Sequence, residues 1–182
     1  MHRATPTRVV VVGTSCVGKS TFAKRLSAAW DIPRIELDFL FWSQDRRPKP
    51  KTDFVDLIAQ ATVASSWIVD GNYGSVRESV WSRATHVIWL NYSLPLNLWR
   101  GFKRTLVRCI TREELWHCNR ESFKRSFMSK ESILVWIFTT HARRQREFIA
   151  LRTSPEFSNL SWLEFRRPSE AESWLRSVEN AA

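Results

Sequence analysis

Residues 13–20, Gly-Thr-Ser-Cys-Val-Gly-Lys-Ser, decide the fold of this 182-residue chain. They match the pattern G-x-x-x-x-G-K-[ST], which is typical of a phosphate-binding loop (P-loop), at every fixed position. The valine-rich residues 8–12 predict a buried strand before the loop, and residues 21–29 predict a helix after it. Successive backbone N–H groups of such a loop converge on a phosphate, and the helix N-terminus adds partial positive charge. The sequence therefore predicts a nucleoside triphosphate site.

Each polar residue of the loop has an expected role. Lys19 is expected to reach the β- and γ-phosphates, and the Ser20 hydroxyl is expected to ligate Mg²⁺. ATP and Mg²⁺ are thus the predicted cofactors. The residues expected to contact the nucleotide are Gly13, Thr14, Ser15, Cys16, Val17, Gly18, Lys19, Ser20 and Thr21.

Length and composition indicate one globular domain. Apolar residues make up 43% of the chain, which excludes a disordered protein, and no apolar run approaches the roughly 20 residues of a transmembrane helix. The N-terminus leads directly into the first predicted strand without room for a signal peptide, so we expect a cytoplasmic protein. We expect no membrane partner, and either a monomer or a homodimer.

Cysteine content and charge narrow the choice of partners. The odd number of widely spaced cysteines, Cys16, Cys109 and Cys118, argues against a disulfide framework or a zinc knuckle. The net charge of +10 suggests an acidic partner, either nucleic acid or a small anionic ligand.

Strand and helix patterns alternate along the chain, which predicts an α/β fold with a parallel sheet between two helical layers. The expected strands are residues 8–12, 34–38, 67–70, 86–90 and 160–165. The expected helices are residues 19–30, 52–65, 75–82 and a last one after residue 168. Thr52 is expected to cap the second helix, and Ser169 with Glu172 is expected to form a capping box on the last. Residues 1–182 then form one kinase-type domain with a helical, lid-like insertion at about residues 94–150, broken near Thr111 and Ser129.

The helical insertion is basic. Arg100, Arg104 and Arg108 recur every fourth residue and therefore share one helix face. Further basic residues follow: Lys103, Arg112, Arg120, Lys124, Arg125 and Lys130. An arginine lid that clamps the phosphates is one interpretation, with Arg104 and Arg108 as the first choices for catalysis. A solvated helix face and a nucleic-acid groove are the alternatives.

Carboxylates end two of the predicted strands. Glu36 and Asp38 lie two apart on the strand of residues 34–38, so both should emerge at the carboxyl end of the sheet, where ligands bind. There Asp38 could orient an acceptor hydroxyl and take its proton, and Glu36 could hold a Mg²⁺-bound water. A surface pair or an acidic helix cap is the alternative.

The strand of residues 67–70 ends in Asp70, which could reach Mg²⁺ through water. Gly71 and Asn72 follow it and, with Arg77, are predicted to contact the substrate, although Asp-Gly-Asn is also an ordinary turn sequence. Trp42 is the tryptophan we expect to stack on an acceptor ring, with core burial as the alternative.

Several segments together resemble one family. They are GTSCVGKST (13–21), IELDFLFW (35–42), WIVDGNY (67–73), REELWHCNRESF (112–123), SKESILVW (129–136), TTHARR (139–144) and FRRPSEAESWL (165–175). Their combination is similar to the small bacterial P-loop proteins known as adenylate kinase-like or DNA topology modulation protein-like kinases. The resemblance implies a nucleoside monophosphate kinase fold with strand order 2-3-1-4-5 and a helical lid. It also implies that Pro168 lies on a loop that contacts adenine.

The acceptor stays open at this stage. In shikimate kinase-like and antibiotic phosphotransferase-like relatives of that family, an aspartate about nineteen residues after the P-loop lysine binds the acceptor hydroxyl, and Asp38 has this spacing from Lys19. Adenylate kinases carry Gly-Phe-Pro-Arg after the third strand, whereas residues 71–74 here read Gly-Asn-Tyr-Gly. The prediction is a Mg²⁺-dependent ATP phosphotransferase acting on a nucleotide, a nucleoside, a hydroxylated metabolite or an antibiotic. A nucleic-acid-binding P-loop NTPase and a nucleotide-binding regulator without catalysis are the alternatives.

Overall fold

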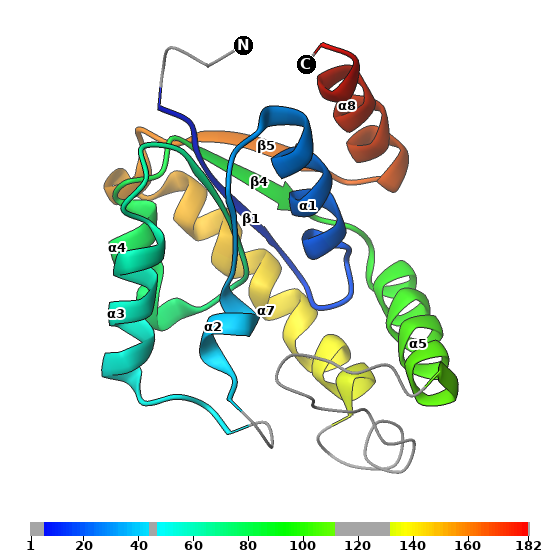
Figure 1. The fold of residues 1–182 in the computed structure, drawn as a ribbon. Coiled ribbons are helices and arrows are strands. Elements are labelled where there is room, and N and C mark those ends of the chain that lie inside the picture. Colours follow the sequence, from blue (N-terminus) through cyan, green and yellow to red (C-terminus); the bar gives the residue numbers. More distant parts are fainter. Residues whose placement is uncertain (1–5, 44–46, 112–131, 182) are drawn as a thin grey trace.

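The computed structural model describes residues 6–43, 47–111 and 132–181, and a five-stranded parallel sheet lies at its centre (Figure 1). The strand order is β2-β3-β1-β4-β5, which confirms the predicted fold class and order. The strands are β1 Arg8–Gly13, β2 Arg34–Glu36, β3 Trp67–Asp70, β4 His86–Leu90 and β5 Ser161–Phe165.

Helices cover both faces of the sheet (Figure 1). The described helices are α1 Lys19–Trp30, α2 Leu37–Phe41, α3 Lys51–Ala61, α4 Arg77–Trp81, α5 Leu94–Thr111, α7 Ile133–Thr153 and α8 Pro168–Asn180, with 3₁₀ turns at Gly74–Val76 and Pro155–Phe157. Helices α1 and α8 pack on one face, whereas α3, α4 and the second half of α7 pack on the other.

The central strand β1 explains why both faces are covered. Its valines alternate between the two layers: Val9 and Val11 face α1 and α8, and Val10 and Val12 face α3, α4 and α7. All four are at most 1% exposed. A strand with apolar residues on both sides needs cover on both sides, so it takes the centre of a parallel sheet.

The second strand is shorter than the sequence suggested, and the prediction that Glu36 and Asp38 share a strand face is wrong. Glu36 pairs in register with Asp70, the last residue of β3, so the residues after Glu36 have no partner strand. The chain turns into α2 at Leu37, whose side chain covers Gly71. Asp38 therefore lies in the first turn of a short helix.

Two predicted helix caps are also wrong. Pro50 precedes α3, and the Thr52 hydroxyl bonds to Asp53 Oδ1 (3.1 Å) instead of capping the helix. In α8, Pro168 takes the first helical position, where its missing N–H costs nothing. The Ser169 cap is displaced as a result, and Glu170 accepts the Arg167 N–H (3.2 Å).

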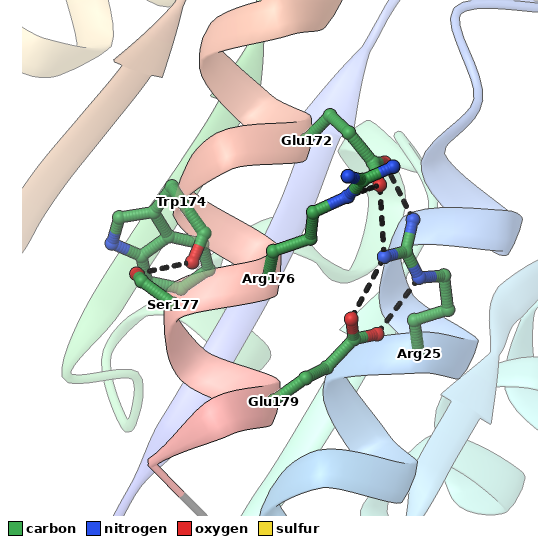
Figure 2. Close-up of polar contacts among 6 residues, drawn as sticks. All are labelled: Arg25, Glu172, Trp174, Arg176, Ser177 and Glu179. Carbon is green, nitrogen blue, oxygen red and sulfur yellow. Dashed lines mark hydrogen bonds and ion pairs between the residues drawn. The ribbon is translucent and has the colours of Figure 1, made fainter.

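Glu172, predicted to cap α8, instead ties this helix to α1. Figure 2 shows Arg25 of α1 between two carboxylates of α8, 2.6 Å from Glu172 and 2.8 Å from Glu179. Beneath this pair, the Trp174 ring stacks on Phe22 with 5.9 Å between ring centroids. Helix α1, which begins at the P-loop, is thereby fixed to α8.

Helices α5 and α7 form most of the predicted insertion. Helix α5 ends at Thr111 as expected, whereas the expected break at Ser129 lies outside the described residues. Phe148 of α7 is 1% exposed within the core, so the second half of α7 is also a covering helix of the sheet. Within the described part of the chain, no helix is both long and apolar enough to cross a bilayer.

Gly13 has no room for a side chain. Its φ is +147°, and an added Cβ would lie 2.5 Å from the Leu90 carbonyl oxygen, which belongs to the backbone of β4. We expect Gly13→Ala to lower the free energy of unfolding by about 2–4 kcal/mol in urea titrations. Gly74→Ala is the matched control, because a Cβ at Gly74 meets nothing within 4 Å. Equal stability of the two variants would contradict this account.

The link between α1 and α8 is pH-sensitive. Hydrogen bonds from Arg25 and Arg176 lower the pKa of Glu172 from 4.5 to about 2, and Arg25 also lowers the pKa of Glu179. The ionised carboxylates are the bonded form, so their stabilisation is complete above about pH 5 and is lost as the pH falls from about 4.5 towards 2. Arg25→Gln should therefore unfold more easily than the native protein at pH 7, and urea titrations should show the difference shrinking towards pH 3. Arg176→Gln, at a more exposed position, should have a smaller effect. A difference that is constant with pH would contradict the assignment.

Candidate active site

The P-loop joins β1 to α1 with its backbone exposed to an incoming anion. Cys16 and Gly18 both have positive φ (65° and 106°), and the Val17 N–H bonds to Thr14 O (3.3 Å). No side chain caps the N-terminus of α1. The first N–H groups of the helix and its partial positive charge are thus available to a phosphate.

Lys19 lies under this loop between two carboxylates. Its Nζ donates to Gly13 O (3.0 Å) and Thr14 O (3.1 Å). Burial lowers the pKa of Lys19, and the negative charges of Asp70 and Asp38 oppose that shift. One ammonium group therefore lies close to both carboxylates that the sequence predicted for the site.

Asp70 has the surroundings of a metal-binding carboxylate. It is 3% exposed, and its Oδ2 has no hydrogen bond among the described residues, although Arg34 Nη1 is 3.7 Å away. Burial raises the pKa of Asp70, and Lys19 and a hydrogen bond from the Ser20 side chain oppose the shift. An unsatisfied buried carboxylate oxygen beside a hydroxyl fits Mg²⁺, which prefers oxygen ligands and completes its shell with water and phosphate.

Glu36, the other predicted metal ligand, lies beside Asp70 in the sheet register. Its Oε2 accepts a hydrogen bond from Arg34, which also donates to Ser20 O (2.8 Å). Arg34 therefore links the end of β2 to the start of α1. The sequence analysis missed it, because an arginine at the start of a strand carries no signal for the site.

Asp38 lies on the acceptor side, where its neighbours are aromatic. The Tyr73 hydroxyl donates to Asp38 Oδ1 (2.5 Å). Phe41 packs against the rings of Tyr73 (4.7 Å) and Trp42 (4.8 Å). Trp42 thus lies beside the carboxylate as predicted, within a cluster of aromatic rings.

The other predicted substrate residues lie close by and are engaged with protein groups. The Asn72 amide bonds to both the N–H and the carbonyl of Gly13, which fixes the start of the P-loop. Arg77 bonds to Glu147 of α7 and lies over the Trp81 ring (5.6 Å). Gly71 lines a small cavity of about 10 Å³ together with Asn72 and Arg77, which has room for a single water.

Arg100, at the inner face of α5, contacts the P-loop. It donates to Val17 O (2.7 Å), and its guanidinium lies over the Tyr92 ring (5.2 Å). Arg104 and Arg108, the first choices from the sequence, lie further along the same face and are half-buried, and Arg104 Nε has no hydrogen bond among the described residues. Their roles in catalysis stay predictions. The basic residues Arg112, Arg120, Lys124, Arg125 and Lys130 lie outside the described residues.

Arg144 of α7 is the other arginine close to the site. Its positive charge contributes to lowering the pKa of both Lys19 and Tyr73, so it lies near both halves of the site. Burial lowers the pKa of Arg144 itself, and its Nε has no hydrogen bond among the described residues. A buried guanidinium with an unused N–H beside a phosphate-binding lysine is suited to binding an anion.

A cavity of about 470 Å³ opens from the end of the P-loop. Its lining includes Gly18 and Thr21 of the loop and helix, Tyr92 and Arg100, and Pro168 at the start of α8. The volume is within the range of nucleotide sites. Pro168, which the family resemblance assigned to adenine contact, thus lies at the same cavity as the P-loop.

Solved structures similar to this chain are P-loop kinases. Shikimate kinase from Bacteroides thetaiotaomicron is 12% identical with a TM-score of 0.55, and the match covers 96% of this chain and 97% of that one. A gluconokinase from Sinorhizobium meliloti 1021 is 18% identical with a TM-score of 0.54, covering 98% and 97%. Shikimate kinase from Acinetobacter baumannii, in complex with shikimate, is 10% identical with a TM-score of 0.53, covering 98% and 93%.

At such identities the likeness shows the fold alone, which is that of the nucleoside monophosphate kinase-like P-loop kinases. No protein-family model and no curated protein matches the chain. The narrower resemblance to adenylate kinase-like or DNA topology modulation protein-like kinases stays a prediction.

Arg100 offers a direct test of the nucleotide cavity. Because its guanidinium contacts the P-loop and lines the cavity, Arg100→Gln should weaken ATP binding by about 10-fold or more. Lys103→Gln is the matched control, since Lys103 is exposed on the same helix. Isothermal titration with ATP measures both. Unchanged affinity in Arg100→Gln would place the nucleotide elsewhere.

Proposed function

We propose that this chain is a Mg²⁺-dependent ATP phosphotransferase that acts on a hydroxyl group of a small molecule. The observation that carries the proposal is the position of Lys19, close to both Asp70 and Asp38. One carboxylate suits a metal ion and the other suits an acceptor, and the ammonium between them suits the phosphate that is transferred. The kinase fold of the similar solved structures supports the same chemistry as an analogy.

On the nucleotide side, the P-loop N–H groups and Lys19 would bind the β- and γ-phosphates. Ser20 and Asp70 would hold Mg²⁺, which would neutralise phosphate charge when bound. Arg100 would fix the nucleotide at the far end of the loop, next to Pro168 and the base. Arg144, with Arg104 and Arg108 as further candidates, would stabilise the charge that develops during transfer.

On the acceptor side, Asp38 would orient the hydroxyl and accept its proton as the new O–P bond forms. The bond between the γ-phosphorus and the β–γ bridging oxygen breaks in the same step, and ADP leaves. The aromatic rings around Asp38 would cover an apolar or ring-shaped part of the acceptor. The acceptor class within the hydroxylated compounds is left to experiment.

A nucleic-acid surface has less support than the charge pattern suggested. Arg100, Arg104 and Arg108 are half-buried on the inner face of α5, and Lys103 is the exposed basic residue among the described part of this helix. A groove for nucleic acid requires its arginines on the surface.

The proposal is tested by ADP release from Mg²⁺-ATP with a panel of nucleosides, nucleoside monophosphates, polyols, hydroxy acids and hydroxylated antibiotics, with mass spectrometry of the products. We expect one class to be phosphorylated. Asp38→Asn should then lower kcat by about 10²–10⁴ and leave ATP affinity within about threefold, because Asp38 acts on the acceptor. Asp53→Asn, exposed on α3, is the matched control. Slow hydrolysis that no acceptor stimulates, and that Asp38→Asn does not change, would refute the proposal.

A further inference from the structure

Tyr73 is the residue of the acceptor side that the proposed chemistry leaves without a role. Its hydroxyl donates to Asp38 Oδ1 (2.5 Å), and among the described residues no other side chain is hydrogen-bonded to that carboxylate. The bond joins two segments that are distant in sequence, α2 after β2 and the residues that follow β3. It is therefore a tertiary contact at the proposed reaction centre.

Helix α2 cannot fix the Asp38 carboxylate by itself. It is five residues long, no side chain caps it, and its next residue, Phe39, is 50% exposed. A helix of this length is marginal without tertiary support. The orientation of the carboxylate thus depends on what contacts it from outside the helix.

Tyr73, in contrast, is held firmly. Its ring packs against Phe41 (4.7 Å) and Phe54 (5.2 Å), and Phe54 is 1% exposed. Asn72, the residue before it, is bonded to Gly13 at the start of the P-loop. The position of the Tyr73 hydroxyl is thereby fixed relative to the phosphate-binding loop.

The phenol also stays a hydrogen-bond donor. Burial and the negative charge of Asp38 raise the pKa of Tyr73 well above its ordinary value of 10.0, against a smaller opposing effect of the Trp42 indole. The O–H bond is therefore intact throughout the pH range of a kinase assay, and Oδ1 of Asp38 remains engaged.

We propose that Tyr73 is a positioning residue that engages Oδ1 of Asp38 and thereby presents Oδ2 to the acceptor hydroxyl. This inference rests on the proposed function of Asp38. It assigns to the Asp70-Gly71-Asn72-Tyr73 segment a second task beside metal binding, since the same short stretch fixes the P-loop through Asn72 and the acceptor carboxylate through Tyr73.

Tyr73→Phe tests the role, because it removes one oxygen atom and keeps the ring. We expect kcat to fall by about 10–100-fold with the best acceptor of the panel, with smaller changes in acceptor KM and with ATP affinity unchanged. Phe54→Leu is the matched control: it loosens the packing of the Tyr73 ring and leaves its hydroxyl in place. It should lower the urea midpoint and reduce kcat by less than threefold. Equal kcat losses in the two variants, or an unchanged kcat in Tyr73→Phe, would overturn the proposal.

A second measurement separates this inference from the proposed function. The ¹³C resonance of the Asp38 carboxyl, assigned by its loss in Asp38→Asn, should shift in Tyr73→Phe and stay in place in Phe54→Leu. An unshifted resonance would overturn the inference even in an active kinase. A shifted resonance in a protein that phosphorylates no acceptor would preserve the contact but refute the proposed function and, with it, the positioning role.

Discussion

A buried ammonium group is the constraint on which the rest of this site depends. Moving a charged amine out of water is costly unless other groups replace the lost hydration. Here the replacement comes from two P-loop carbonyls and from the charges of Asp70 and Asp38. Each of these groups follows a different strand, and the strand order 2-3-1 brings the three strand ends together at one edge of the sheet. The topology of the sheet and the position of Lys19 are therefore parts of one solution.

The positive groups around Lys19 exceed what the two carboxylates balance. Arg144 lowers the pKa of Lys19, and both the lysine and the arginine are shifted towards their neutral forms by burial. Arg100 adds a third positive charge at the far end of the loop. Such an arrangement is unfavourable by itself and becomes favourable with a polyanion, because the phosphates relieve the repulsion among the cations. The electrostatic strain of the empty site is thus the counterpart of its proposed affinity for a triphosphate and a metal ion.

The sequence predicted the parts of the fold whose signals are local and periodic. The bounds of α1, β3 and β4 agree with those expected, because a buried strand or an amphipathic helix repeats its signal over several residues. The P-loop motif gave the nucleotide side for the same reason. The errors lie where one residue of a partner decides: β2 ends at Glu36 because β3 ends at Asp70, and Glu170 replaces Ser169 at the start of α8 because Pro168 sets the first turn.

The choice among the arginines failed for a related reason. A fourfold spacing shows that Arg100, Arg104 and Arg108 share a face, but the distance of each from the P-loop depends on how α5 packs. Tyr73 gave no signal at all, since a tyrosine after a turn is unremarkable until α2 brings Asp38 to it.

The two halves of the site are also anchored differently. The nucleotide half has one continuous support: α1 carries the P-loop, Arg25 ties α1 to α8, and Pro168 at the start of α8 lines the base end of the cavity. The acceptor half has only the short helix α2 and the residues after β3, joined by the contact between Tyr73 and Asp38. Because a few aromatic contacts and one hydrogen bond hold the acceptor half, small substitutions there can change the acceptor without disturbing the nucleotide. This division explains how one fold can keep its phosphate donor while its acceptors differ.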